Sequence, residues 1–345
     1  MGINIGIARD DRFLTHKTGH FHPEHPKRLD SIYRMLDRDF ANRLVSYTAV
    51  PAPMDLVEAI HSPEHIRRVL KTAEQRVTNL APDTPVSAQS YMAAWLAVGA
   101  CLQGIDALIS GDCSSFFALI RPPGHHALAA RAGGFCIFNN ISIAAKYAIK
   151  HHQINRILVI DWDVHHGNGI QTLFYHDPRV LYISTHDLML YPYSGEPEQT
   201  GTDWGEGFTI NAPIFRAMTD DDVIWLYQSI LTPVIRSFKP ELIMVAAGFD
   251  AHQDDPLGRS RWTEAAYAGI IRGLNHAKKS VGDPPIFLAL EGGYNPGALA
   301  RCVHSVLSEL SENAVESSEF PPAQEETARL MGRLLKIHSK YGLMA

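Results

Sequence analysis

The 345-residue sequence is poor in cysteine and contains no CxxC pair. Its four cysteines are widely separated, which is typical of reduced, mostly buried thiols in a reducing compartment. The segment MGINIGIARDDRF at the start carries charge within ten residues and contains no long apolar run. It predicts neither a signal peptide nor a membrane anchor, and Gly6 stands where a myristoylation signal needs Ser or Thr. We therefore expect a cytoplasmic protein that does not bind a membrane.

Positive charge is not in excess either. The formal net charge is −6, which argues against a protein that coats nucleic acid or an anionic membrane. The chain is 46% hydrophobic and 20% charged, as in an ordinary globular protein. Histidine, in contrast, is abundant, with 18 residues, several of them in pairs. His151-His152 follows a helical pattern and is interpreted as a pair at the C-terminus of a helix.

Short apolar runs alternate with longer helical patterns, and no repeat or linker divides the chain. The runs predict strands at 3–7, 115–120, 156–160, 180–184, 242–246 and 286–290. The helical patterns cover 87–110, 141–151, 220–238, 263–279, 296–310 and 324–340, and Ser87 is the predicted N-cap of the first. This alternation predicts a single α/β domain over residues 1–345 with a mainly parallel sheet.

Four of these strands are followed by polar clusters. The clusters are RPPGHHA at 121–127, DWDVHHGNG at 161–169, AGFDAHQDDPLG at 247–258 and EGGYN at 291–295. Because parallel strands place their carboxyl ends at one edge of the sheet, we expect the four loops to converge into one site.

Asp163 and His165 are two residues apart, so an extended segment could aim both side chains in the same direction. With Asp255 from another loop they would give an Asp2His set, which leaves a position open for water and substrate at a catalytic zinc. The alternative is that Asp163 caps a helix and His165 packs beneath a loop. Neither interpretation is excluded by the spacing alone.

His125-His126 follows a rigid Arg-Pro-Pro-Gly turn, where one imidazole could accept a proton and the other stabilise charge. Tyr294 follows two glycines and could donate a hydrogen bond to a developing oxyanion. The alternatives are loop imidazoles that bond backbone groups and a tyrosine that is half-buried by packing.

From about His16 to Val303 the sequence resembles the zinc-dependent histone deacetylase and acetylpolyamine amidohydrolase superfamily. The motifs that carry the resemblance are HPEHPKRL, DTPVSAQSYMAAWLAVGA, RPPGHHA, GGFCIFNN, DWDVHHGNGIQ, STH, DPLG and EGGYN. The resemblance implies an arginase/deacetylase-like three-layer α/β/α fold with about eight strands.

It also implies a metal-assisted hydrolysis of N-acetyl amides. The positions that match the zinc ligands are Asp163, His165 and Asp255. His125 and His126 match the tandem active-site histidines, and Tyr294 matches the tyrosine that holds the oxyanion.

The hydrogen-bond partners of the two histidines suggest that the histidines have different catalytic roles. In the family the first histidine pairs with a residue matching Asp161 and the second with one matching Asn168. A carboxylate favours an imidazolium and an amide does not, so we expect a cationic His125 and a neutral general base at His126.

Further positions follow from the resemblance. Gly134, Phe135 and Tyr191 match the wall of a channel for a thin aliphatic chain, and Asp83 matches a rim residue that holds substrate amides. The structural alternative for Asp83 is a turn residue. Leu257 and Gly292 are also expected at the substrate site. A potassium or sodium site is implied at Asp161, Asp163, His165, Ser184 and Thr185, largely through backbone oxygens.

Several alternatives stay open. An acetylpolyamine amidohydrolase would use the same chemistry, but Leu257 stands where one branch carries an acidic gatekeeper. A catalytically silent acyl-lysine binder and a two-metal, arginase-like hydrolase rank lower, because the expected ligands and tyrosine are intact and further ligands are missing. Ferrous iron or cobalt could replace zinc, the acyl group is not defined, and a homo-oligomer is compatible with the sequence.

Overall fold

Eight strands form the central sheet of the protein, and all of its neighbouring strand pairs are parallel. The computed structural model describes residues 5–75, 78–311 and 324–344. From one edge to the other the strands are β2 (Val45–Tyr47), β1 (Ile5–Ala8), β5 (Ser115–Ala118), β10 (Ile286–Leu290), β9 (Leu242–Ala247), β6 (Ile157–Asp161), β7 (Val180–His186) and β8 (Thr209–Pro213). A separate antiparallel pair consists of β3 (Asn79–Ala81) and β4 (Thr84–Pro85).

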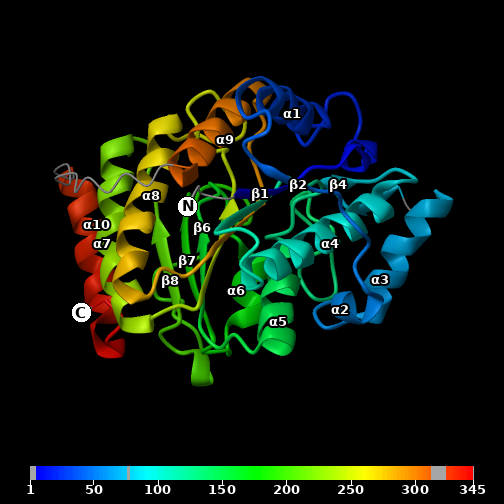
Figure 1. The fold of residues 1–345 in the computed structure, drawn as a ribbon. Helices are drawn as coiled ribbons and strands as arrows, with labels where there is room; N and C mark the ends of the chain where they lie inside the picture. The colour runs from blue at the N-terminus through cyan, green and yellow to red at the C-terminus, as the bar shows by residue number, and fades with distance from the viewer. Residues whose placement is uncertain (1–4, 76–77, 312–323, 345) are drawn as a thin grey trace.

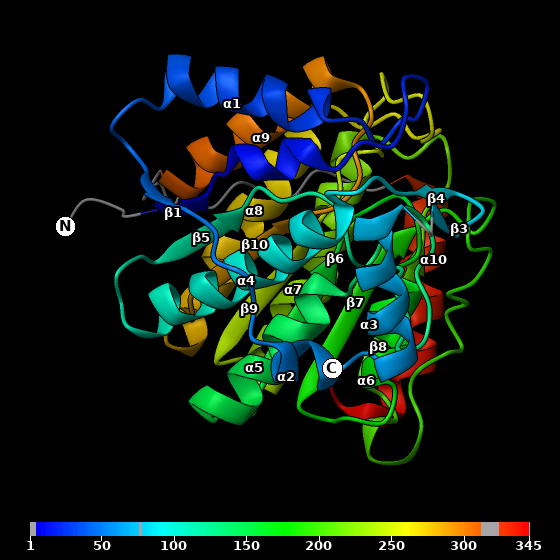
Figure 2. The same ribbon diagram turned by 90° about the vertical axis from the view of Figure 1, so that its right-hand side faces the viewer.

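Helices cover both faces of this sheet (Figure 1). A row of contacting helices on one face consists of α1 (Lys27–Asp39), α9 (Pro296–Ser311), α8 (Glu264–Lys278), α7 (Asp220–Phe238) and α10 (Glu325–His338). The other side carries α4 (Ser90–Ile109), α5 (Asn140–His152), α6 (Asn168–Phe174), α2 (Met54–Glu58) and α3 (Pro63–Leu70), as Figure 2 shows. The predicted α/β/α architecture with a mainly parallel sheet is confirmed.

The inner strands are apolar because both of their faces are covered. β6 and β9 read ILVID and LIMVAA and are buried along their whole length. Helix α4 is long and apolar enough in composition to cross a membrane, but 78% of its most apolar window is buried inside the protein. Its apolar character is therefore accounted for by packing between the sheet and its neighbours.

The structure differs from the sequence predictions at the two edge strands of the sheet and at the start of α4. All six predicted strands are present, although residues 3 and 4 of the first lie outside the described residues. The edge strands β2 and β8 were not predicted, since β2 is short and exposed and β8 has the mixed sequence TINAP. Ser87 is not the N-cap of α4, which begins at Ser90, because the Ser87 N–H donates to the Ser90 hydroxyl in a preceding turn.

The sheet order explains why the four polar loops meet. Strands β5, β10, β9 and β6 are consecutive neighbours, and they are parallel, so their carboxyl ends form one continuous edge. The predicted convergence of the loops that follow these strands is thereby confirmed. The functional side chains lie along this edge.

Candidate active site

Two carboxylates and one imidazole converge at the carboxyl ends of β6 and β9. Nδ1 of His165 lies 3.0 Å from Oδ1 of Asp163 and 3.0 Å from Oδ2 of Asp250. One ligand atom from each of the three residues lies within 4.8 Å of the other two. Asp163 and Asp250 are fully buried. Burial, followed by the charge of Asp163, raises the pKa of Asp250 to about 7.

Such a group fits a divalent cation. Two buried carboxylates repel each other, and a cation between them and the imidazole removes that cost. One nitrogen and two carboxylate oxygens are a zinc-type donor set, and three protein ligands leave a position for substrate and water. The carboxylate of Asp250, a residue that the sequence analysis did not single out, belongs to this group and is a candidate third ligand.

The predicted ligand Asp255 has a different environment. Its Oδ1 accepts hydrogen bonds from the backbone N–H groups of Leu257 (2.9 Å) and Gly258 (3.2 Å). Its Oδ2 accepts from the N–H groups of Tyr294 and Asn295. Asp255 thus joins the DPLG turn to the Tyr294 loop. Asp255 as a metal ligand stays a prediction, and Asp250 is a further candidate for the third position.

The tandem histidines stand beside this group, with their rings 4.0 Å apart. Nδ1 of His125 lies 3.2 Å from Oδ2 of Asp161, and Nδ1 of His126 lies 2.8 Å from Oδ1 of Asn168. Both predicted pairs are present in the structure. Nε2 of His125 lies 3.9 Å from Oδ2 of Asp163, so this imidazole adjoins the metal-ligating side chains directly.

The two histidines differ in their electrostatic surroundings. Burial lowers the pKa of His125, but the carboxylates of Asp163 and Asp161 outweigh it and raise the pKa to about 10. Burial lowers the pKa of His126 well below its ordinary value, and the charges of His125 and His165 lower it further. These directions are the ones that a cationic His125 and a neutral His126 require.

Tyr294 lies in a loop that several contacts hold in place. Nε of Arg28 donates to the Gly293 carbonyl (2.6 Å), and its guanidinium lies 5.0 Å from the centre of the Tyr294 ring. Burial raises the pKa of Tyr294 well above its ordinary value, and the charges of Asp250 and Asp163 raise it further. The hydroxyl is therefore a protonated hydrogen-bond donor in the field of the metal-ligating carboxylates.

Gly292 has its predicted place at the site, and its lack of a side chain is required there. Its N–H donates to Oδ2 of Asp163 at 2.8 Å. A Cβ at this position would lie 2.1 Å from Oδ2 of Asp250, so any other residue would displace a ligand. The backbone of Gly292 therefore lies directly against the carboxylates of Asp163 and Asp250.

The predicted channel residues form the approach to His126. The rings of His126 and Tyr191 lie 4.9 Å apart, and those of Phe135 and Tyr294 lie 5.6 Å apart, both edge to face. Gly134 has a φ of 56°, and a Cβ there would lie 2.2 Å from the His126 ring. Glycine is therefore required both by the backbone conformation and by the space.

Asp83 holds this channel loop. Its Oδ2 accepts the N–H of Gly134 at 3.0 Å and its Oδ1 accepts the Thr84 hydroxyl at 2.9 Å. A cleft of about 740 Å³ opens here, and its lining includes Asp83, His126 and Tyr191 together with Arg68. Asp83 is thus at the rim, as predicted, and it also anchors a structural turn, which was its alternative role.

The remaining predicted positions have mixed surroundings. Leu257 is partly exposed in the turn held by Asp255. Asp161 and Ser184 face each other in the register of β6 and β7. The side-chain hydroxyls of Ser184 and Thr185 hydrogen-bond His186 and Tyr227, respectively. That cation site stays a prediction.

Some supporting residues were missed by sequence reasoning. The Tyr182 hydroxyl donates to Oδ2 of Asp161 at 2.9 Å and so restrains the partner of His125. Oε2 of Glu291 accepts the N–H groups of Gly124 (2.7 Å) and His125 (3.1 Å), which fixes the histidine turn. The position of Glu291 directly after β10 was the available indication.

Comparison with known proteins agrees with this geometry. Residues 22–310 match the family described as histone deacetylase domain. A probable deacetylase of Archaeoglobus fulgidus is 35% identical over 85% of this chain and 82% of its own length. The histone deacetylase-like amidohydrolase of Pseudomonas aeruginosa is 34% identical over 84% of this chain and 77% of its own length.

Larger relatives and a solved structure complete the comparison. Histone deacetylase HDA1 of Candida albicans is 34% identical over 93% of this chain and 41% of its own length. In histone deacetylase HDA1 of Saccharomyces cerevisiae the match covers 53% of its own length. The chain thus spans about half the length of these curated relatives. The crystal structure of the HDA15 HD domain superposes with a TM-score of 0.90 at 30% identity, covering 98% of this chain and 95% of that one. The chain belongs to the histone deacetylase domain family.

Proposed function

We propose that this protein is a zinc-dependent deacetylase that hydrolyses the N-acetyl amide of acetylated lysine. The observation that carries the proposal is the meeting of three kinds of group at one sheet edge. These are the candidate metal ligands Asp163 and His165 with Asp250 or the predicted Asp255, the tandem histidines and the Tyr294 hydroxyl. A zinc ion held by the first group would polarise the acetyl carbonyl and activate water.

The protein's own side chains perform the other steps of this reaction. His126, neutral and bonded through Nδ1 to Asn168, presents its other nitrogen as the base that accepts the proton of the attacking water. His125, cationic between Asp161 and Asp163, stabilises negative charge. The Tyr294 hydroxyl donates to the developing oxyanion. The residues that would hold the implied potassium or sodium ion, largely through backbone oxygens, are Asp161, Asp163, His165, Ser184 and Thr185.

Replacing Tyr294 with phenylalanine removes that donor without changing the shape of the ring. We expect kcat for an acetyl-lysine peptide to fall about 10²- to 10³-fold with little change in KM, as for loss of other oxyanion donors. The measurement is steady-state hydrolysis by the zinc-loaded protein. Phe135→Leu, which trims a channel wall, is the comparison and should act mainly on KM. A Tyr294→Phe variant with normal kcat would exclude the assigned role.

Charge at the cleft favours a lysine side chain on a peptide over a polyamine. The cleft beside the channel is lined by Arg68 and Arg131, both exposed. Arg68 also donates to the Asn79 carbonyl at 3.5 Å. The positive charges of Arg68 and Arg131 repel the remaining ammonium group of an acetylated polyamine and attract acidic residues of a peptide.

We expect Arg68→Glu combined with Arg131→Glu to raise kcat/KM for acetylputrescine and to lower it for a peptide with acidic residues beside the acetyl-lysine. Each exposed charge contributes about 0.5–1 kcal/mol, so each changes kcat/KM by about 2- to 5-fold. Raised salt should remove both effects. Arg67→Glu, on the same helix but outside the cleft lining, is the matched control. An unchanged preference in the double variant would remove this argument for the substrate.

The decisive experiment is hydrolysis of an acetyl-lysine peptide and of acetylputrescine, side by side, by protein loaded with one zinc per chain. We expect turnover of the peptide that Asp163→Ala abolishes and that Tyr294→Phe lowers about 10²- to 10³-fold. Preference for acetylputrescine would assign the protein to the polyamine branch instead. Turnover of neither compound, with the metal bound, would contradict the proposed deacetylase and favour a binding role.

A further inference from the structure

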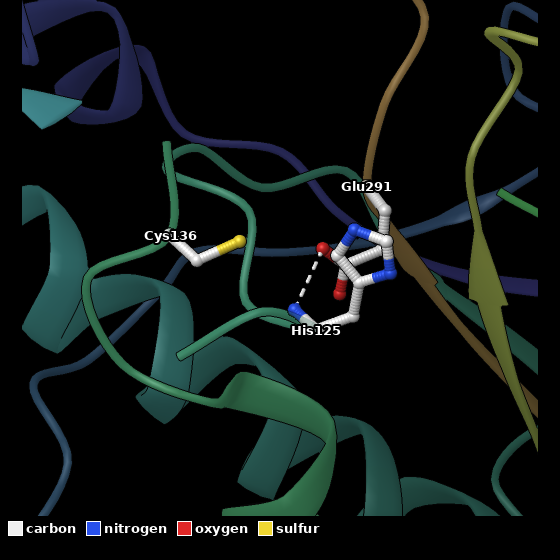
Figure 3. Close-up of side chains that lie close together, drawn as sticks. All are labelled: His125, Cys136 and Glu291. Carbon is white, nitrogen blue, oxygen red and sulfur yellow. Dashed lines mark hydrogen bonds between the residues drawn. The ribbon is translucent and has the colours of Figure 1, made fainter. Parts of the chain in front are cut away.

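A second group of potential metal ligands includes His125, the first of the two tandem histidines. A ring nitrogen of His125, Sγ of Cys136 and a carboxylate oxygen of Glu291 all lie within 4.8 Å of one another. His125 and Cys136 come from the loop between β5 and α5, Glu291 follows β10, and all three side chains are buried. In Figure 3 the Cys136 thiol points toward the imidazole and the carboxylate.

Glu291 has an unsatisfied oxygen in this pocket. Oε2 accepts the backbone N–H groups of Gly124 and His125. Oε1 is buried and has no hydrogen-bond partner within the described part of the chain. A buried carboxylate oxygen without a partner is costly, and native proteins avoid it unless a ligand or water is bound there. The free oxygen is therefore an independent indication of a ligand.

The chemistry of the three donors selects the ligand. A thiolate, an imidazole and a carboxylate together match zinc and cobalt, whereas magnesium and calcium require oxygen donors. Sγ of Cys136 already accepts the His126 N–H at 3.5 Å and donates to the Gly134 carbonyl at 3.3 Å. A bound cation competes with these contacts, so its affinity should be lower than that of the group around Asp163.

We propose that His125, Cys136 and Glu291 form a second, weaker site for a divalent transition metal, and that its occupation inhibits the enzyme. The inhibitory part rests on the proposed deacetylase function, since a metal on His125 removes the imidazolium from catalysis. The binding part does not depend on it. Of the two groups, only the second contains sulfur, because the first consists of Asp163, His165 and Asp250.

This difference in donors makes the two sites distinguishable by cobalt titration. The first equivalent of Co²⁺ is expected at the oxygen and nitrogen ligands, without a thiolate-to-cobalt charge-transfer band in the near ultraviolet. Further Co²⁺ should produce that band. Cys136→Ser should remove it, and Glu291→Gln should weaken binding by at least the about 10- to 100-fold expected for a lost metal contact. Cys302→Ser, at another buried thiol, should leave the band unchanged.

The inhibition is measured by titrating zinc beyond one equivalent during turnover. The wild-type protein should lose activity as zinc rises, and Cys136→Ser, which should keep its activity at one equivalent, should need at least about 10-fold more zinc for the same loss. No charge-transfer band at excess cobalt in the folded wild-type protein would overturn the site. A band without inhibition would overturn the participation of His125. If the charge-transfer band forms but the protein hydrolyses no substrate, the second metal site stands and only the proposed deacetylase function fails.

Discussion

Asp250→Asn is expected to release the catalytic metal and to abolish turnover. The substitution keeps the shape of the side chain but removes one of the two charges that converge on His165. Loss of a partner outside the ligand set costs about 10- to 100-fold in metal affinity, so loss of a direct ligand should exceed about 100-fold. The measurement is metal content per chain after dialysis, followed by competition with a chelator.

Asp255→Asn provides the matched control, since it removes a carboxylate five residues away in the same loop. Asp255 accepts backbone N–H groups from the Tyr294 loop and from the DPLG turn. We therefore expect this variant to keep one metal per chain and to lose only part of its turnover through a displaced Tyr294. Metal lost from Asp255→Asn but kept by Asp250→Asn would assign the third position to Asp255 instead.

The choice between these two aspartates shows where sequence reasoning ends. The motif AGFDAHQDDPLG offers several carboxylates, and any of them could follow β9 into the site. Asp250 is the third residue after the strand, close to its carboxyl end, whereas Asp255 is five residues farther on. Only the path of the loop shows that backbone N–H groups occupy Asp255, because hydrogen bonds between distant loops leave no pattern in the sequence.

Other parts of the site could be predicted because the residues involved are close together in the sequence. His125 and His126 are adjacent on one turn, and their partners Asp161 and Asn168 belong to a single motif. The sheet was predictable for a similar reason, since its inner strands are continuous apolar runs. The edge strand β8 was not predicted because its mixed sequence TINAP resembles a loop, although four of its five residues are buried. Residues that act through long-range contacts, such as Tyr182 and Glu24, carry no local indication of their role.

Glu24 gives the largest expected effect on stability. Its carboxylate is fully buried between two buried arginines, with Oε1 3.0 Å from Arg28 and Oε2 2.6 Å from Arg121. Burial lowers the pKa of the nearby His16 to about 3, so His16 is neutral near pH 7. Glu24→Gln would leave two guanidiniums buried without a counter-charge. We expect the free energy of unfolding to fall by about 3–5 kcal/mol.

The same substitution should also reach the active site, because Arg28 holds the loop of Tyr294 while Arg121 begins the turn that carries the histidines. Urea unfolding measures the loss of stability, and kcat measures the loosening of the loops. Glu64→Gln, at an exposed pair with Arg67, is the control and should change neither. Equal stability of the two variants would show that the buried network contributes little.

The pH dependence of this difference follows from Glu24 itself. Burial alone would raise the pKa of Glu24, but the charges of Arg121 and Arg28 outweigh it and hold the folded-state pKa well below 4.5. A group with a lowered folded pKa stabilises the protein above its unfolded value, and this stabilisation is lost as the pH falls toward the folded value. The gap between wild type and Glu24→Gln should therefore be full near pH 7 and narrow steadily below pH 4.5. A gap that stays constant with pH would mean that the substitution acts through packing and not through the lost charge.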